Sequence, residues 1–388
     1  MNLSPAAAAA RKAVSTPLYG LVYLALADLA YTDEKHDCES KVTADLQNAV
    51  ANLPPLPAPA GSVPDTVPGS WKVTWGPVYT QDYSNLMYAA TYTDADSGLP
   101  IFGVVSIRGT DTSADMYGLL QQLLEDTTDL RMVRWDDAVV GKCGLIDTGI
   151  FPGQERIAAG TCRGLQTLTQ LQQSPGGENI LMHLQNDLLV QDPQMPIVVT
   201  GHSLGGCQVT VLAPYLAKNL PAGTVIVPNP FAPPTAGNAA FALNAFDLAF
   251  PGANVWWNTL DLVPQAYASI GDINSLWNHY QWPDGTPGPA LPADHVLSKI
   301  VNDLAAWLKI AMYHYTQPTT GNIALLGSLP APETMQQFLQ GSGSTEAWNS
   351  WPAQLLWQHM PPNYHALISN QFDAATVARY PLLVIPSC

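Results

Sequence analysis

The chain has 388 residues, of which 47% are hydrophobic and 12% are charged. This composition is too apolar for a disordered chain, and no apolar run is long enough to cross a bilayer, so we expect a soluble globular protein. Acidic residues outnumber basic ones 31 to 15, for a formal net charge of -16, and Lys and Arg form no cluster, which argues against nucleic acid as a partner.

The N-terminal segment carries no clear signal for export. Residues 1–16 are rich in Ala, and a chain end of this kind is expected to be poorly ordered. The next segment, Leu18–Tyr31, alternates small and large apolar residues as a buried helix does. Asp28 interrupts this run and no small-residue cleavage site follows it, so we predict no cleaved signal peptide. We therefore expect a cytoplasmic protein, or one secreted by a route without a cleaved signal.

Strands and helices alternate along the middle of the chain. A Pro-rich stretch, Pro54–Pro68, first interrupts regular structure. The predicted strands are Ser84–Thr93, Ile101–Ile107, Ile197–Thr200, Thr224–Val227 and Asn254–Leu260. The predicted helices lie around Leu119–Leu124 and at Ser203–Leu220 and Ala239–Ala249. Such alternation indicates an α/β fold with a mostly parallel sheet.

The pattern changes in the C-terminal third. From Ala268 to Trp351 the chain contains helical segments, such as His295–Tyr313, and loops rich in Gly, Pro and Ser, but no clear strand. We interpret residues 268–351 as a helical insertion over one end of the sheet. Residues 17–388 are then expected to form a single domain that carries this insertion.

A strand, a tight turn and a helix surround Ser203. The β-branched run Ile197–Thr200 leads directly into Gly-His-Ser-Leu-Gly at 201–205, and a helical pattern follows. A serine on such a turn is held in a strained backbone conformation that exposes its hydroxyl, and flanking glycines avoid steric collisions. The N-terminus of the next helix can stabilise a developing oxyanion, and the Leu204 N–H is the first candidate donor. We predict that Ser203 is the nucleophile of a serine hydrolase.

With these motifs the sequence resembles the class 3, or fungal-type, lipases of the α/β-hydrolase superfamily. Besides the turn at Ser203, three segments agree in order: Ile107–Asp115, Gly149–Phe151 and Pro230–Asn238. The resemblance implies an α/β-hydrolase fold, with a mostly parallel central sheet flanked by helices and a helical lid. It also implies that Thr110 supplies the second oxyanion donor.

The acid of the site is expected to follow Ser203, because α/β-hydrolases carry their triad in the chain order Ser, Asp or Glu, His. Asp261 ends a segment that begins with a predicted strand, and its surroundings resemble the family's Asn-x-x-Asp-x-Val-Pro motif. The other late acids lie in a helix or in the insertion, where a solvated carboxylate is the default: Asp247, Asp272, Asp284 and Asp294. We predict Asp261 as the acid.

The base is harder to assign, because five histidines follow Asp261. Packing, capping or surface exposure explains three of them, His279, His295 and His314. The resembled family often ends with a histidine a few residues before a Tyr and an apolar helix. His359, which precedes Tyr364, fits that layout best, and His365 stays the alternative.

The remaining histidines and the cysteines show no metal-ligand spacing, so we predict no catalytic metal and no cofactor. His202 is expected to shape the turn beside the nucleophile, while His183 has no partner pattern. The five cysteines are odd in number, so at least one is unpaired within the chain. Cys143 and Cys162 could form a disulfide or stay as buried thiols, and the sequence does not decide between the two.

We therefore predict a carboxylic ester hydrolase that works through a Ser-His-Asp triad and an acyl-enzyme, most simply a triacylglycerol lipase. Phospholipase A1, short-chain esterase and acyltransferase are alternatives, because their triads do not differ. A non-catalytic binding protein of the same fold is the rival of a different class, and the intact motif at Ser203 argues against it. The expected partner is an ester or lipid. One apolar helical face would suit a lid that opens at a lipid-water interface, or equally a helix packed on the core: Leu119, Leu120, Leu123 and Leu124.

Overall fold

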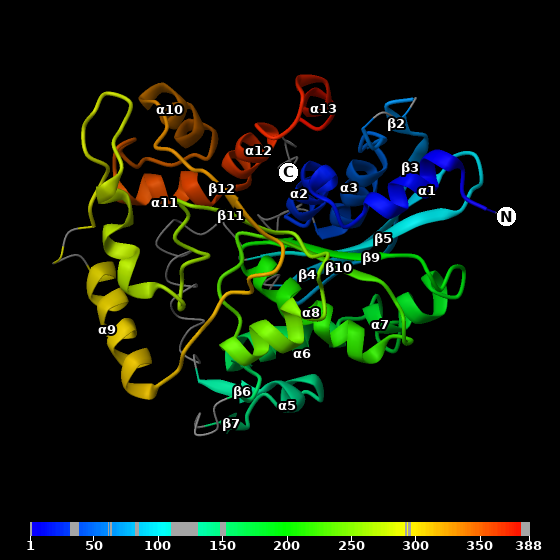
Figure 1. Ribbon diagram of the computed structural model, residues 1–388, viewed down its shortest axis with the longest axis horizontal. Coiled ribbons are helices and arrows are strands. Elements are labelled where there is room, and N and C mark those ends of the chain that lie inside the picture. The colour runs from blue at the N-terminus through cyan, green and yellow to red at the C-terminus, as the bar shows by residue number, and fades with distance from the viewer. Residues whose placement is uncertain are drawn as a thin grey trace.

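The computed structural model describes residues 2–31, 39–60, 62, 64–81, 85–109, 131–147, 153–291, 293 and 296–381. A central sheet with helices on both faces dominates this part of the chain (Figure 1). Its seven strands follow the order β12-β11-β10-β9-β5-β4-β3. Their bounds are β3 (Gly69–Tyr79), β4 (Leu86–Asp94), β5 (Pro100–Ile107), β9 (Ile197–His202), β10 (Ile226–Phe231), β11 (Val255–Asn258) and β12 (Asn322–Leu325). β4 is antiparallel to both β3 and β5, whereas the strands from β5 to β12 are parallel, which confirms the predicted α/β sheet.

Alternate side chains of the central strands enter two separate cores. Val104 and Val198 pack in the core that contains helix α2 (Gly20–Leu29), whereas Val105 and Val199 pack in the core that contains helix α8 (Leu204–Asn219). Helices α2 and α3 (Glu39–Ala51) therefore lie on one side of the sheet, and α8 and α6 (Ala159–Gln170) lie on the other (Figure 1). Because both faces are covered, the central strands β5, β9 and β10 are buried at every position rather than at alternate ones.

The first residues form a docked helix where the composition indicated little order. Helix α1 (Pro5–Ala13) is capped by the side chain of Ser4. Ser4 also donates its N–H and its hydroxyl to the buried carboxylate of Asp94, at 3.0 and 2.9 Å. Near the other end, the guanidinium of Arg11 donates to the carbonyl oxygen of Ile101 at 2.9 Å. These long-range polar contacts hold the helix in place, and an Ala-rich composition cannot reveal them.

The segment expected to be a purely helical insertion, residues 268–351, supplies a strand of the sheet. β12 pairs in parallel with β11 at the sheet edge. It has four residues, too few to show a clear period-two pattern, and this explains why the sequence did not reveal it. The helix expected at His295–Tyr313 is present as α9 (Val296–Ala311). The other elements of this region and of the C-terminus are η5 (Ile270–His279), α10 (Pro332–Gly341), α11 (Trp351–His359), α12 (Pro361–Ser369) and α13 (Ala374–Arg379).

The remaining elements are short. A three-stranded sheet lies beside helix α5 (Trp135–Val139) and contains β6 (Met132–Arg134), β7 (Ile146–Asp147) and β8 (Arg156–Ala158). The others are η1 (Pro17–Tyr19), β1 (Leu56–Pro57), β2 (Thr66–Val67), α7 (Ile180–His183) and two π-helices, η3 (Leu184–Leu188) and η4 (Phe241–Asp247). Among the described helices, none is both long and apolar enough to cross a membrane. The predicted helix around Leu119–Leu124 lies outside the described residues.

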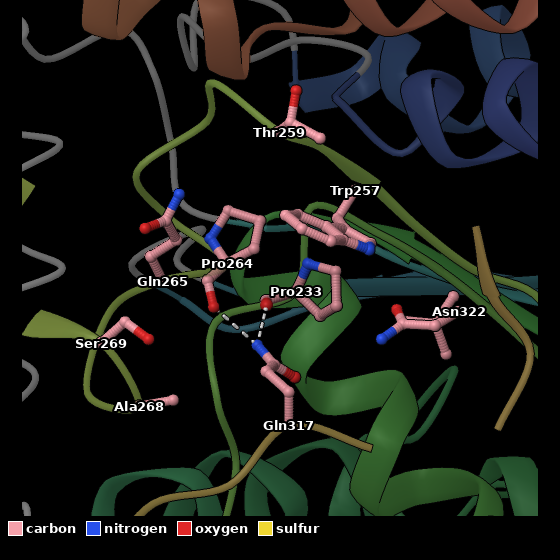
Figure 2. A pocket seen from close by; sticks show the side chains of 10 residues that line it. Pro233, Trp257, Thr259, Pro264, Gln265, Ala268, Ser269, Gln317 and Asn322 are labelled. Atoms are coloured by element: carbon pink, nitrogen blue, oxygen red, sulfur yellow. Dashed lines mark hydrogen bonds between the residues drawn. The ribbon is translucent and has the colours of Figure 1, made fainter. Parts of the chain in front are cut away.

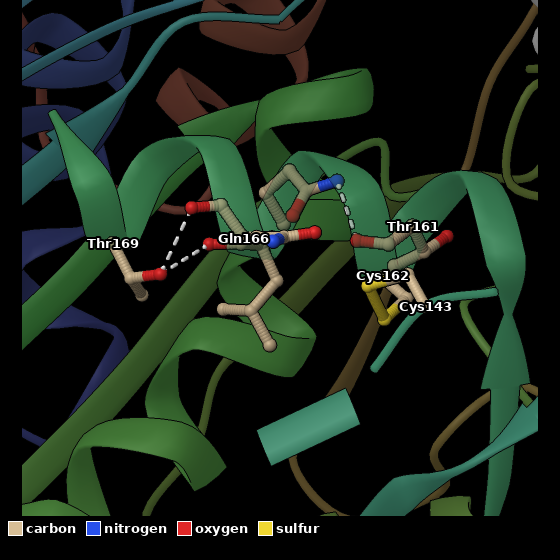
Figure 3. The surroundings of a disulfide bond; sticks show 7 residues. Cys143, Thr161, Cys162, Gln166 and Thr169 are labelled. Carbon is tan, nitrogen blue, oxygen red and sulfur yellow. Dashed lines mark hydrogen bonds between the residues drawn. A yellow bond between two sulfur atoms is a disulfide. The ribbon is translucent and has the colours of Figure 1, made fainter. Parts of the chain in front are cut away.

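A disulfide bond joins Cys143 to Cys162 (Figure 3), with the two Cα atoms 5.5 Å apart. Cys162 belongs to α6 and Cys143 precedes β7, so the bond ties the small sheet to a helix that packs against α8. The sequence left this pairing open. Cys207 is a buried free thiol, and burial raises its pKa to about 12. The other two cysteines, Cys38 and Cys388, lie outside the described residues.

Candidate active site

The turn at Ser203 has the strained geometry that the motif predicts. β9 ends immediately before this residue and α8 begins immediately after it. Ser203 has φ 60° and ψ -128°, a conformation that residues other than glycine rarely adopt. Its N–H donates to the carbonyl oxygen of Phe231 at 3.0 Å, which anchors the turn to the end of the neighbouring strand β10. Strain of this kind persists only where the surroundings enforce it, and it is concentrated at functional sites.

Two glycines make room for this turn. A Cβ atom on Gly205 would lie 2.4 Å from the carbonyl oxygen of Ile107, and one on Gly201 would lie 2.7 Å from the backbone of Gly205. Real Cβ atoms essentially never come this close to a backbone atom. Only glycine therefore lets β9 and α8 pack against the end of β5, which is the steric reason for the spacing of the motif.

Asp261 lies just beyond β11 and is fully buried. Its Oδ1 accepts a hydrogen bond from the N–H of Val263 at 2.9 Å. Its Oδ2 accepts from the hydroxyl of Tyr364 at 2.8 Å and lies 2.8 Å from Nδ1 of His359. Both carboxylate oxygens thus face donors, which is the environment that a buried ionised carboxylate requires.

The hydroxyl of Tyr364 has two partners. It donates to Asp261 and accepts from the backbone N–H of Asn258 at 3.0 Å. Burial, and next the charge of Asp261, hold the pKa of Tyr364 well above its ordinary value, so the phenol keeps its proton and remains a donor. The sequence used Tyr364 only as a marker of the segment after His359. No local pattern could have indicated that its hydroxyl reaches an aspartate 103 positions earlier.

His359 bridges Asp261 and Ser203. It is the last residue of α11, and its Nε2 lies 2.8 Å from Oγ of Ser203 while its Nδ1 lies 2.8 Å from Oδ2 of Asp261. An ionised carboxylate can only accept, so we assign the ring proton to Nδ1 and the lone pair to Nε2. In this tautomer, Nε2 is the atom that can take the proton of the serine hydroxyl.

His202 contacts the backbone of His359. Its Nε2–H donates to the carbonyl oxygen of His359 at 2.8 Å, and the two ring centroids are 4.8 Å apart. Burial, and next the proximity of His359, hold the pKa of His202 well below its ordinary value. The ring is therefore neutral, and its N–H fixes the position of the last residue of α11. The sequence indicated that His202 shapes the turn, but it gave no sign of this link.

The alternative base does not contact the pair formed by Ser203 and Asp261. His365 faces the C-terminal segment instead, with its Nε2 2.6 Å from the carbonyl oxygen of Tyr380. Two other late histidines, His279 and His314, are exposed, and His295 lies outside the described residues. Of the late histidines that the structure describes, His359 is the one within hydrogen-bonding distance of the serine.

One of the two predicted oxyanion donors can be placed. Leu204 is the first residue of α8, and the N–H groups of the first helical turn have no partner within the helix. The N-terminal end of the helix also carries a partial positive charge, which favours an anion at this position. Thr110, the other predicted donor, lies outside the described residues.

The three side chains lie below the protein surface. The exposed fractions are 2% for Ser203, 1% for His359 and 0% for Asp261. The electrostatic interactions among them are therefore stronger than they would be in water.

A cavity of about 350 Å³ adjoins the loop after Asp261, and its lining does not include the triad (Figure 2). The side chain of Gln317 lines this cavity. Its Nε2 donates to the carbonyl oxygens of Pro233 and Pro264, both at 2.8 Å. Pro233 follows β10 and Pro264 lies three positions after the acid, so this one amide ties together the loops at the ends of two adjacent strands.

Comparison with known proteins found a family model that matches the middle of the chain. Residues 104–269 match the family model described as Lipase (class 3). This segment is similar to the class 3 lipases. It contains Ser203 and Asp261, and the match confirms the predicted class of enzyme, a carboxylic ester hydrolase. No curated protein sequence matches the chain.

Solved structures of lipases are similar to this chain to different extents. The M37 lipase superposes with a TM-score of 0.66 at 22% identity, over 92% of this chain and 96% of that one. A triacylglycerol lipase from Penicillium expansum is similar at 20% identity over 51% of this chain and 63% of that one, with a TM-score of 0.34. The first likeness confirms the predicted α/β-hydrolase fold.

Proposed function

We propose that the protein hydrolyses the ester bonds of triacylglycerols, with Ser203 as nucleophile, His359 as base and Asp261 as the acid that orients the base. The observation that carries the proposal is the continuous series of contacts from Oγ of Ser203 to Nε2 of His359 and from Nδ1 of His359 to Oδ2 of Asp261, each 2.8 Å. These distances lie within the range that proton transfer requires. The class 3 lipase segment supports a lipid ester as the substrate.

The reaction begins when Oγ of Ser203 attacks the ester carbonyl carbon and its proton passes to Nε2 of His359. The carbonyl oxygen becomes an oxyanion, and the imidazolium is stabilised by the carboxylate of Asp261. Collapse of this intermediate breaks the bond to the alcohol, which leaves with the proton from Nε2. Water then gives a proton to Nε2 and attacks the acyl-enzyme, and the fatty acid is released as Ser203 regains its proton.

The oxyanion is stabilised in this proposal by the N–H of Leu204 and by Thr110. Leu204 supports this role through its place at the start of α8, whereas Thr110 has it from the family resemblance alone. Each such donor lowers the activation free energy by on the order of 3 kcal/mol. The low exposure of Ser203 implies that neighbouring elements move before an ester reaches it. The interpretation of Leu119–Leu124 as a lid stays a prediction.

A substitution series tests the assignment of the triad. Wild type, Ser203→Ala, His359→Ala and His365→Ala are incubated with p-nitrophenyl butyrate and with a fluorescent organophosphate probe. We expect Ser203→Ala and His359→Ala to lose both turnover and labelling. His365→Ala is the matched histidine control and is expected to retain both. A His359→Ala variant with full activity would remove His359 as the base. A folded wild-type protein that neither turns over nor is labelled would instead support a binding protein.

The substrate is tested separately. Emulsified trioctanoin, phosphatidylcholine vesicles and soluble p-nitrophenyl butyrate are offered to the wild-type protein, and released fatty acid is titrated. A preference for the emulsion supports a triacylglycerol lipase. Preference for the phospholipid indicates a phospholipase A1, and preference for the soluble ester indicates a short-chain esterase. Repeating the reaction with an added alcohol shows whether the acyl group goes to the alcohol rather than to water, as in an acyltransferase.

A further inference from the structure

A second group of reactive side chains lies on α7, on η3 and on the loop before α7; the two helices pack on the α8 side of the sheet (Figure 1). Glu178, His183 and Asp187 each place one potential ligand atom within 4.8 Å of the other two. None of these residues takes part in the triad. The sequence showed no partner pattern for His183. The structure supplies one, because the chain continues from α7 into the π-helix η3 and brings Asp187, four positions later, next to the His183 ring.

The His183 ring is held in a fixed orientation. The residue is 2% exposed, and its ring stacks on that of Trp75 with centroids 6.5 Å apart and planes 22° apart. Its Nε2 lies 3.1 Å from Oγ1 of Thr74, and its Nδ1 faces Oδ2 of Asp187 at 2.8 Å. One ring nitrogen bonded to a neutral group and the other directed at carboxylates is the arrangement by which proteins orient a metal-binding histidine.

Glu178 is also held by residues that are not ligands. Its Oε1 accepts a hydrogen bond from Nδ2 of Asn186 at 3.2 Å, and its backbone carbonyl accepts from the indole N–H of Trp75 at 3.0 Å. Trp75 therefore contacts both Glu178 and the His183 ring. Two of the three potential ligands are thus positioned by neighbours, which distinguishes this group from a chance gathering of surface acids.

We propose that Glu178, His183 and Asp187 form a structural site for a divalent transition-metal ion, with Zn²⁺ as the first candidate. One imidazole and two carboxylates suit Zn²⁺, whereas Mg²⁺ and Ca²⁺ prefer sites made of oxygen alone. Two carboxylates beside one imidazole also bring negative charge that a dication offsets. The site is separate from Ser203 and concerns stability, so it leaves the prediction of no catalytic metal untouched.

The geometry needs only a small adjustment. Ligand bonds of about 2.0–2.2 Å in a tetrahedral site place ligand atoms roughly 3.3–3.6 Å apart. Nδ1 of His183 and Oδ2 of Asp187 are now closer than this, at 2.8 Å. The Asp187 side chain is 51% exposed, so it is free to rotate outward while the buried histidine stays in place. Binding would join the loop that contains Glu178 to η3.

Zinc binding is tested on the full chain without an affinity tag, after removal of metal with a chelator. Titration with ZnCl₂ in a calorimeter is expected to show one site of micromolar affinity, and Zn²⁺ is expected to raise the midpoint of thermal unfolding. MgCl₂ at the same concentration serves as the control ion and is expected to do neither. Neither readout depends on ester hydrolysis, so the result is independent of the proposed function.

Isosteric variants identify the ligands. Asp187→Asn and Glu178→Gln are each expected to weaken binding at least tenfold, and Thr74→Val, which removes the support of the ring, about tenfold. Asp136→Asn is the matched control, because its carboxylate is 90% exposed and pairs with Lys218; it is expected to bind as wild type does. Absence of a one-to-one site in wild type, or equal binding by folded Asp187→Asn, would overturn the proposal and leave His183 and Asp187 as a hydrogen-bonded pair.

Discussion

The hydroxyl of Tyr364 donates a hydrogen bond of 2.8 Å to Oδ2 of Asp261. The same carboxylate oxygen faces Nδ1 of His359. The tyrosine and the histidine thus hold one oxygen from two sides. Tyr364 comes from α12 and His359 from the end of α11, so the corner between these two helices sets the position of the carboxylate relative to the base.

Tyr364→Phe is expected to lower kcat about tenfold, equal to about 1.4 kcal/mol, with little change in KM. The carboxylate loses a donor and no longer holds the imidazole as firmly. We also expect the free energy of unfolding to fall by about 1–3 kcal/mol, because a buried acceptor loses its partner. Steady-state kinetics and urea unfolding check both. Tyr23→Phe removes a buried hydroxyl that bonds the carbonyl oxygen of Val14, so it should affect stability but not kcat. An unchanged kcat in Tyr364→Phe would refute the positioning role.

Gly205→Ala is expected to disrupt the turn at Ser203. The new Cβ would lie 2.4 Å from the carbonyl oxygen of Ile107, so β5 and α8 must separate. We expect a loss of roughly 1–3 kcal/mol in the free energy of unfolding, together with loss of organophosphate labelling, because the serine no longer keeps its strained backbone. Gly271→Ala is the matched control, since no atom lies within 4 Å of its added Cβ. Normal organophosphate labelling of Gly205→Ala would mean that the turn at Ser203 tolerates a side chain at position 205.

Gln317→Glu replaces an amide that donates to two carbonyl oxygens with a carboxylate of the same shape. The carbonyls of Pro233 and Pro264 then face an oxygen, and the loop that carries Asp261 loses its tie to the loop after β10. We expect a loss of about 1–3 kcal/mol in stability and a lower kcat. Gln340→Glu, which makes the same change at an exposed site, should leave both quantities unchanged. Equal thermal midpoints for the two variants would contradict the prediction.

The pH dependence of stability is expected to include a contribution from His202. Burial, and next the proximity of His359, hold its pKa below the ordinary value of about 6.5, so the folded protein keeps it neutral while the unfolded chain takes up a proton. Its contribution to stability is therefore fully present above pH 6.5 or so and is lost as the pH falls toward the folded pKa, by up to about 1.4 kcal/mol per pH unit. Unfolding at pH 7.5 and pH 5 should show a smaller difference in His202→Gln than in wild type; equal differences would exclude this contribution.

The sequence by itself determined the local features of the site. The strand, turn and helix around Ser203 lie within one short segment, and the glycine spacing follows from collisions that the backbone alone would produce. The alternation of strands and helices along the middle of the chain likewise predicted a mostly parallel sheet. The edge strand β12 and the docked helix α1 escaped prediction, because one is too short to show a period and the other depends on contacts with Asp94 and Ile101.

The tertiary structure alone decided which late histidine faces the serine and what supports it. His359 and His365 are six positions apart beside the same tyrosine; the family resemblance favoured His359 but left His365 as an alternative. The first ends α11 with its ring toward Ser203, whereas the second lies on α12 and bonds Tyr380. The contacts of Tyr364 with Asp261 and of Gln317 with two strand-end loops also join distant segments. Such pairings depend on how the helices pack on the sheet, and sequence periodicity carries no information about them.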